Sequence, residues 1–288
     1  MLGAVVLMGS CCSADVVVAQ HETPRDDIYL IVRSDDMGMT HAVNQACLKT
    51  VTNGIARSIE VIVPAPWFPE AAHMLQQHPE IDVGVHLDLT SEWSAIKWGP
   101  VSAGTKSLVD MNGHFYPTTR QLDGWPPSTG FLESGWKINE VERELRAQIE
   151  TAKRLLPNVT HLSAHMGTAT CTAELKTLVD FLAQEYELPI VLPKLKRAPR
   201  WTKQPTNSEE GEAEMVRLVE GLKPGLWLFV EHPGVDCPEM KAVGHLGNEN
   251  VCETRAAVTA AFTSDKVKEV ARRRGIKLIS YAEALEMQ

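Results

Sequence analysis

The sequence predicts an α/β fold: a single (β/α) barrel-like domain of the distorted TIM-barrel type, with parallel strands. Short β-branched, apolar runs alternate with helical apolar stripes along the 288 residues, which is typical of parallel strands joined by crossover helices. Polar residues follow several of these strands, as they do at the mouth of a barrel. No repeat or linker divides the chain, so we expect one domain over residues 27–288.

The first expected strand begins at Ile28 and ends in two adjacent carboxylates, Asp35 and Asp36, before Gly38. Its apolar run has the length and composition of a buried strand. Neighbouring like charges are costly unless a cation lies beside them, and a metal ion at the C-terminal end of a parallel strand supplies that charge. A strand end followed by an ordinary turn is the alternative interpretation.

The remaining elements follow from periodicity and from end signals. Apolar residues alternate with polar ones over residues 81–89, so His86 is expected on the face opposite the valines and leucines. Asn139 and Glu142 have the spacing of a capping box, and Ser264 has the position of a helix cap. We expect helices at 41–53, 70–77, 139–156, 172–186, 213–222 and 264–274. We expect strands at 28–35, 55–63, 81–89, 161–164, 188–192, 226–230 and 276–279.

Residues 91–135 form a long segment without helix or strand periodicity, and a loop of this length in a compact domain is usually functional or disordered. Its tryptophans, which include Trp93, Trp98 and Trp125, argue against disorder. Such side chains can stack on sugar rings or can pin the loop to the barrel rim. Both interpretations remain open from the sequence.

Composition excludes some partners. The formal net charge of −9 argues against nucleic acid or an anionic membrane as a partner, because both require clustered cations. No segment after the first twenty residues is long and apolar enough to span a bilayer.

Residues 1–20 resemble a signal peptide or leader, with an apolar stretch and small residues before Gln20. We therefore expect export to the periplasm or the exterior, with Cys11-Cys12 as a loose match to a lipid-anchoring site. A cytoplasmic protein with a disordered leader is the alternative. In an exported chain, Cys237 and Cys252 would be the best candidates for a disulfide.

The residues of chemical interest share one feature: they fall at the ends of four expected strands. They are Asp35, Asp36, His86, His165, Glu231 and His232. One carboxylate and two imidazoles form a common open ligand set for Zn²⁺ and related divalent ions. Such an ion makes a bound water nucleophilic near neutral pH. A second carboxylate could accept the proton of that water, and a histidine could protonate a leaving group.

Four segments resemble, in their order, the YdjC-like (ChbG/HpnK) carbohydrate deacetylases. They are Asp35–Gly38, Gly84–Thr90, Thr160–His165 and His232–Gly234. The resemblance extends from Ile28 to Ala282 and implies a (β/α) barrel-like fold. It also implies removal of acetyl groups from N-acetylated amino sugars with one divalent metal ion, Zn²⁺ or Mg²⁺.

Carried over by position, the resemblance implies that Asp36, His86 and His165 bind the metal. It makes Asp35 the catalytic base and His232 a second catalytic residue. His41, Trp93 and Glu231 are expected to contact the substrate.

The sequence also departs from the family pattern. Gly167 replaces a second histidine, Ser163 and Ala164 replace the usual residues before the last ligand, and His41 replaces a smaller residue. These changes leave the three metal ligands intact but affect the groups expected to hold the sugar and the leaving group.

The leading hypothesis is therefore a metal-dependent hydrolase that deacetylates an N-acetylated carbohydrate, as a monomer or a homodimer. A metal-dependent esterase or phosphoesterase acting on a sugar is one alternative. A non-catalytic carbohydrate-binding barrel is the other.

Overall fold

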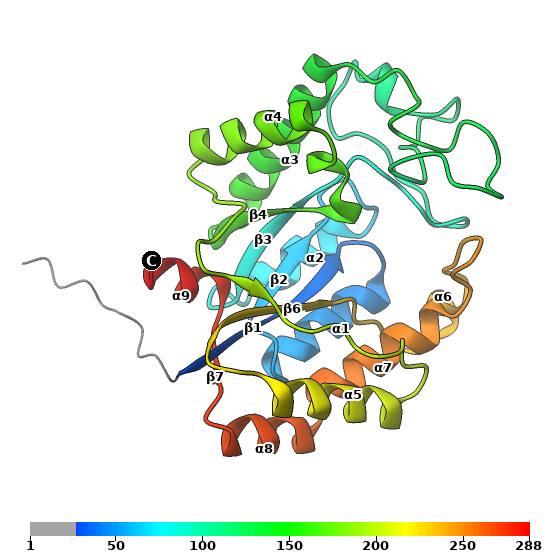
Figure 1. Ribbon diagram of the computed structural model, residues 1–288. Helices are drawn as coiled ribbons and strands as arrows, with labels where there is room; N and C mark the ends of the chain where they lie inside the picture. Colours follow the sequence, from blue (N-terminus) through cyan, green and yellow to red (C-terminus); the bar gives the residue numbers. More distant parts are fainter. Residues whose placement is uncertain (1–26) are drawn as a thin grey trace, which may run out of the picture.

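The computed structural model describes residues 27–288, so the predicted leader at 1–20 lies outside the described residues. The spatial order of the sheet is β4-β3-β2-β1-β6-β5, with β7 also paired to β1 (Figure 1). The strands are β1 (Ile28–Met37), β2 (Ser58–Val61), β3 (Asp82–Leu87), β4 (Val159–Ala164), β5 (Lys196–Arg197), β6 (Gly225–Glu231) and β7 (Lys277–Leu278).

Strand β1 is the centre of this sheet, and nearly all of it is buried. It pairs with β6 from Ile28, opposite Gly225, to Ser34, opposite Glu231. On its other side, β7 pairs with its beginning and β2 with its end. All of these ladders are parallel, as are those of β2 with β3 and β3 with β4. The parallel α/β prediction is confirmed.

The helices cover the sheet in two groups. In Figure 1, α3 and α4 lie together beside β4, whereas α5, α7 and α8 lie together near β1 and β6. The described helices of more than one turn are α1 (His41–Thr52), α2 (Phe68–Gln76), α3 (Ile138–Leu155), α4 (Ala173–Glu185), α5 (Ser208–Gly221), α7 (Val251–Thr263), α8 (Asp265–Arg273) and α9 (Tyr281–Glu286). A short helix, α6, spans Pro238–Lys241.

Several helix ends follow from local sequence. Thr40, Thr172 and Ser264 accept hydrogen bonds from the backbone N–H three residues later, so α1, α4 and α8 are capped, as the sequence predicts for Ser264. The predicted capping box of α3 is wrong. That helix begins at Ile138 without a side-chain cap.

The start of α3 is fixed instead by the preceding loop. Glu140 accepts hydrogen bonds from the backbone N–H (2.8 Å) and hydroxyl (2.9 Å) of Ser107. Glu142 pairs with Arg146 at 2.9 Å and does not bond back to the helix start. A tertiary contact has therefore replaced the local cap.

The predicted strand at 188–192 is also wrong. This segment makes one backbone bond to β4, from the Leu162 N–H to the Pro189 carbonyl at 3.0 Å. Pro189 and Pro193 have no N–H to continue a ladder. The chain pairs later, where β5 joins β6. Within residues 27–288, β4 and β5 are not bonded to each other, so the sheet forms a half-barrel open at this edge.

Helices α7 and α9 were not predicted. In α7 the buried positions cover most of the helix surface and include Val251, Arg255, Val258 and Phe262. A helix buried on most sides has no amphipathic stripe to detect. Helix α9 begins with a capping box of Ser280 and Glu283 but is only six residues long.

The loop at 91–135 is confirmed as irregular apart from the short 3₁₀-helix η1 (Lys106–Leu108). Trp98, Phe115 and Phe131 are buried in the core, so these aromatic residues pin the loop. The carboxylate of Glu144 on α3 accepts bonds from the backbone of Val101 and Ser102 in the loop. The loop is thus tied to α3 beside the open end of the strands.

None of the helices described within 27–288 is long and apolar enough to cross a membrane. Cys237 and Cys252 are both free thiols, and Cys252 Sγ lies 3.4 Å from Asp236 Oδ1. Their pairing in an exported chain stays a prediction.

Candidate metal centre

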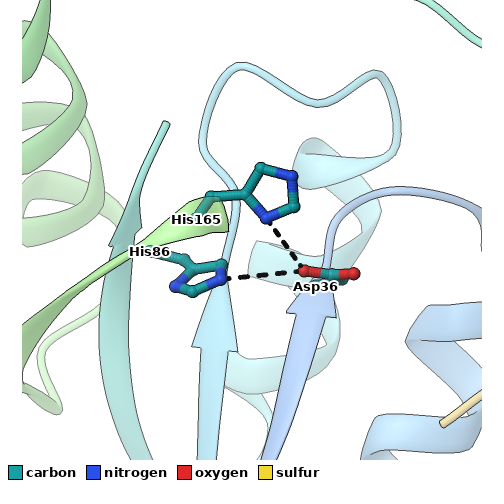
Figure 2. Close-up of side chains that lie close together, drawn as sticks. All are labelled: Asp36, His86 and His165. Atoms are coloured by element: carbon teal, nitrogen blue, oxygen red, sulfur yellow. Dashed lines mark ion pairs between the residues drawn. The ribbon is translucent and has the colours of Figure 1, made fainter. Parts of the chain in front are cut away.

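Asp36, His86 and His165 come together at the C-terminal ends of three strands (Figure 2). Asp36 Oδ1 lies 3.3 Å from His165 Nδ1 and 3.8 Å from His86 Nε2. All three side chains are buried. One ligand atom from each lies within 4.8 Å of the other two, which is close enough for a single ion. We call these three residues the metal centre.

The backbone of β1 is irregular around Asp36. The register with β2 shifts between Ser34 and Met37, and Asp36 has a φ of 73°. In a regular strand, Asp35 and Asp36 would point to opposite faces. With this irregularity, both carboxylates lie near His86 Nε2, at 3.6 Å for Asp35 and 3.8 Å for Asp36. A left-handed non-glycine residue is strained and is often found at functional sites.

A second turn follows the last ligand. After His165, Met166 and Gly167 have φ values of 50° and 69°, so the chain leaves the direction of β4. A Cβ on Gly167 would meet no other atom within 4 Å. The glycine is therefore favoured by its backbone conformation.

The metal centre contains buried polar atoms without partners. Asp36 Oδ1 and His165 Nδ1 make no hydrogen bond although both are buried, and neither does Arg255 Nη1 nearby. Such atoms are costly unless something satisfies them. Two of them are atoms that a metal ion would bind. The residues present therefore fit a divalent ion.

Each histidine has its other ring nitrogen held by a partner. His86 Nδ1 lies 2.5 Å from Ser163 Oγ, and His165 Nε2 lies 3.1 Å from Glu92 Oε2. The free nitrogen of each ring is then the one that faces Asp36. Outer partners of this kind commonly orient histidine ligands of metals.

The imidazoles of His86 and His165 have pKa values shifted in opposite directions. Burial and the neighbouring His165 lower the pKa of His86 to about 3, so this imidazole is neutral, as a ligand must be. Burial alone would also lower the pKa of His165, but Glu92, Asp88 and Asp36 raise it well above its usual value. These carboxylates therefore favour the protonated form of His165, and a metal ion bound at its Nδ1 would have to displace that proton.

The pKa of Asp36 lies well below its usual range. Burial opposes ionisation, but His232, Arg255 and His165 outweigh it. Arg255 on α7 donates to Asp36 Oδ2 at 2.6 Å, and its guanidinium lies 5.4 Å from the ring of Trp93. The second oxygen of Asp36 is thus occupied, which leaves Oδ1 as the ligand atom.

A cavity of about 520 Å³ opens onto the metal centre. Asp36 and His165 form part of its wall, with Trp93, Glu231 and His232. These last three were predicted to act on or contact the substrate, and the structure places them at the cavity. Trp93 is only 3% exposed, because it stacks on His245 with ring centroids 5.3 Å apart.

Three predicted site residues do not line this cavity: His86, whose ring nitrogen faces Asp36, and also Asp35 and His41. Asp35 has both carboxylate oxygens 2.8 Å from donors of Arg33. His41 lies at the start of α1, half-exposed, and its Nδ1 is 2.7 Å from Glu70 Oε1. The roles proposed for Asp35 and His41 stay predictions.

Three residues of the site were missed from the sequence: Glu92, Ser163 as a partner of His86, and Arg255. Glu92 lies in the loop at 91–135, where no periodicity indicates orientation. Arg255 lies on the unpredicted α7. An arginine buried to 6% exposure is rarely unpaired, but the sequence alone does not indicate burial.

A parallel half-barrel with a buried carboxylate and two imidazoles at its strand ends defines a class of α/β proteins with a candidate divalent-metal site. Comparison with known proteins gives the particular family. The model of the YdjC-like protein family matches residues 29–273, and the chain belongs to this family.

Relatives support the same assignment. A carbohydrate deacetylase of Thermus thermophilus is 34% identical over 239 residues, covering 74% of this chain and 80% of the relative. A carbohydrate deacetylase of Geobacillus stearothermophilus is 27% identical over 263 residues, covering 88% and 97%. A crystal structure from Enterococcus faecalis V583, provisionally described as a cellobiose-phosphate cleavage protein, has a TM-score of 0.70 at 23% identity. It covers 90% of this chain and 99% of its own, and it supports the fold.

Proposed function

We propose that this protein is a metal-dependent deacetylase of N-acetylated carbohydrates. The observation that carries the proposal is a pair of buried atoms without hydrogen bonds, Asp36 Oδ1 and His165 Nδ1, beside a cavity of about 520 Å³. The relatives named carbohydrate deacetylase supply the substrate class.

Asp36, His86 and His165 would hold the ion. Two imidazoles and a carboxylate suit Zn²⁺ better than Mg²⁺, which prefers oxygen ligands. A bound divalent ion polarises a carbonyl group and lowers the pKa of a water molecule. Three protein ligands would leave a coordination position for water or substrate.

Asp35 is the proposed base. Its carboxylate lies 3.6 Å from His86 Nε2, so it faces the region between the ligands. The two-pronged contact with Arg33 fixes the plane of the carboxylate. Each carboxylate oxygen has a second lone pair beyond the one that accepts from Arg33 and could accept a proton there.

His232 is the proposed acid. It is half-buried in the cavity wall. Burial alone would lower its pKa, but Asp36 and Glu231 raise it above its usual value. A protonated imidazole near neutral pH can donate to the nitrogen of the departing amine. Trp93 and Glu231 would contact the sugar from the same cavity, and His41 would do so from the rim.

The test combines metal analysis with acetate release from defined N-acetylglucosamine oligosaccharides. We expect the wild-type protein to bind one equivalent of Zn²⁺ and to release acetate. We expect Asp36→Asn to lose both, because the substitution removes a ligand charge and leaves Arg255 unpaired. Acetate release by the metal-free protein, or full activity in Asp36→Asn, would contradict the proposal.

A panel of substrates separates the alternatives. O-acetylated and phosphorylated sugars in the same assay test an esterase or phosphoesterase. Oligosaccharide binding without any product, with metal present, would instead indicate a binding protein. His232→Gln is the matched variant for the acid role, since it keeps the size and polarity of the side chain. It should reduce turnover of amide substrates and leave Zn²⁺ binding unchanged.

A further inference from the structure

Ser163 connects the metal centre to the buried carboxylate of Glu60, which has no role in the mechanism proposed above. Ser163 Oγ lies 2.5 Å from His86 Nδ1 and 2.5 Å from Glu60 Oε2. The three residues lie on the neighbouring strands β4, β3 and β2, and His86 is directly opposite Ser163 in the ladder. Glu60 is fully buried. A continuous line of polar contacts therefore crosses the sheet.

The other contacts of Glu60 fix the direction of these hydrogen bonds. Its Oε1 lies 2.6 Å from His161 Nε2 and 3.2 Å from Arg33 Nη1. A carboxylate with a guanidinium and an imidazole beside it is ionised and can only accept hydrogen bonds. Ser163 must then donate its single proton to Glu60.

With that proton used, Ser163 Oγ can only accept from His86. Nδ1 of His86 therefore carries the ring proton, and Nε2 carries the lone pair. Nε2 is the atom 3.8 Å from Asp36 Oδ1. A neutral imidazole binds a metal through its unprotonated nitrogen, so the contacts select the tautomer that can bind.

We propose that Glu60 and Ser163 are positioning residues, which hold His86 in its metal-binding tautomer and ring orientation. The inference deepens the proposed function and rests on its metal site, while it is independent of the substrate. Neither residue would touch the metal or the sugar.

Gly84 leaves the space that the contact between Glu60 and Ser163 requires. It lies on β3 opposite Glu60 on β2 and opposite His161 on β4. A Cβ at this position would lie 2.4 Å from Glu60 Oε1 and 2.5 Å from His161 Nε2. Any side chain larger than hydrogen would force the carboxylate away. The absence of a side chain lets Glu60 reach across β3 to Ser163.

The main experiment measures the dissociation constant of Zn²⁺ for Ser163→Ala, Ser163→Thr and wild-type protein. We expect Ser163→Ala to bind Zn²⁺ about 10–100-fold more weakly, the usual effect of losing an outer partner. Ser163→Thr keeps the hydroxyl group and should restore most of the affinity lost in Ser163→Ala.

Ser58→Ala is the matched control. Ser58 is also a buried serine with its Oγ 2.5 Å from a buried carboxylate, that of Asp82, but it has no contact with His86. It should lose stability and keep wild-type affinity for Zn²⁺. Equal affinity of Ser163→Ala and wild type, or an equal loss in Ser58→Ala, would overturn the proposal.

A spectroscopic measurement covers the case in which a variant folds poorly. The ¹⁵N shifts of His86 in the wild-type, metal-free protein should show a proton on Nδ1. A proton on Nε2 would refute the inference without any mutation. In Gly84→Ala, the absorption bands of bound Co²⁺ should change, although neither Glu60 nor Ser163 is altered; unchanged bands would count against the inference.

Failure of this inference and failure of the proposed function give different results. Weaker Zn²⁺ binding in Ser163→Ala without acetate release by the wild type would support the positioning role and reject the deacetylase. Acetate release by the wild type, together with equal Zn²⁺ affinity in the wild type and Ser163→Ala, would support the deacetylase and reject the positioning role.

Discussion

Two clusters of buried charged residues lie next to each other inside the half-barrel, and they differ in one respect. The interior network, which we define as Arg33, Glu60, His161 and Ser163, has a hydrogen-bond or ion-pair partner for its buried polar atoms. The metal centre is equally buried, but Asp36 Oδ1 and His165 Nδ1, which lie 3.3 Å apart, make no hydrogen bond.

Hydrogen-bond satisfaction distinguishes buried charges that stabilise the fold from buried charges that could bind a ligand. Each cluster contains a carboxylate and at least one histidine on or next to a strand. A fully satisfied network stabilises one arrangement of the core. Unsatisfied atoms of the metal-binding type indicate a ligand that the protein itself does not supply. Each prediction below tests this distinction, in order of decreasing effect.

The largest effect is expected in the interior network. Arg33→Met removes the cation between Asp35 and Glu60 and leaves two buried carboxylates without it. Removing one partner of a buried pair costs about 3–5 kcal/mol. Urea unfolding of the metal-free protein should show a loss in this range. A loss below about 1 kcal/mol would mean that the network does not stabilise the fold.

The metal centre should show the opposite behaviour, gaining stability from an added ligand. Zn²⁺ at 100 times its dissociation constant should add about 2.7 kcal/mol to the free energy of unfolding. For a domain of this size, Tm rises by roughly 5–10 °C. Differential scanning calorimetry with and without a chelator measures the shift.

The control for that measurement is Asp36→Asn. It removes one ligand charge, so its Tm should be insensitive to Zn²⁺. An equal rise in Tm in this variant would show that the ion binds elsewhere.

A smaller effect concerns pH. The carboxylates around His165 raise its pKa. In the metal-free protein, the imidazole should therefore keep its proton at pH values above about 6.5, where an ordinary histidine loses it. Zn²⁺ must displace that proton. Affinity should therefore increase as pH rises, by about tenfold per pH unit, and should level off above the folded pKa of His165.

The same shift has a second consequence with the opposite sign. A group whose pKa is raised on folding stabilises the protein fully below its unfolded pKa, and this contribution is lost as pH rises through the folded pKa. The metal-free protein should thus lose stability over the range in which Zn²⁺ affinity increases. Isothermal titration calorimetry and thermal unfolding at several pH values test both trends. A flat affinity profile would mean that His165 carries no proton before Zn²⁺ binds.

The smallest effect lies at the edge of the interior network. The hydroxyl group of Thr160 donates to Asp82 Oδ1 at 2.5 Å, and Asp82 has further donors in Ser58 and the backbone of Tyr281. Thr160→Val should cost about 1–2 kcal/mol and leave Zn²⁺ affinity unchanged. A change in affinity would show that the two clusters are coupled beyond the Ser163 contact.

The ends of strands predicted which residues would meet. Six candidates, Asp36, His86 and His165 among them, lie at such ends, and parallel strands bring their C-terminal ends to one edge. The resemblance to the family then singled out these three as ligands. His161, four residues before His165, lies within β4 and belongs to the interior network.

The errors have local causes. The segment at 188–192 has the composition of a strand, but Pro189 and Pro193 prevent a continuous ladder. Helix α7 lacks a polar stripe because most of its surface is buried, and with it Arg255 was missed. The predicted capping box of α3 is wrong because a contact between Glu140 and Ser107 replaces the local cap.

Periodicity and strand ends in the sequence predicted most of the strands and helices and the parallel sheet, and the family resemblance supplied the three candidate ligands. Which nitrogen of each imidazole faces Asp36, how Glu60 reaches Ser163 past Gly84, and the contact of Arg255 with the second oxygen of Asp36 depend on tertiary packing. These contacts join residues up to 219 positions apart. Their geometry depends on strand register and helix packing, which no local pattern of residues encodes.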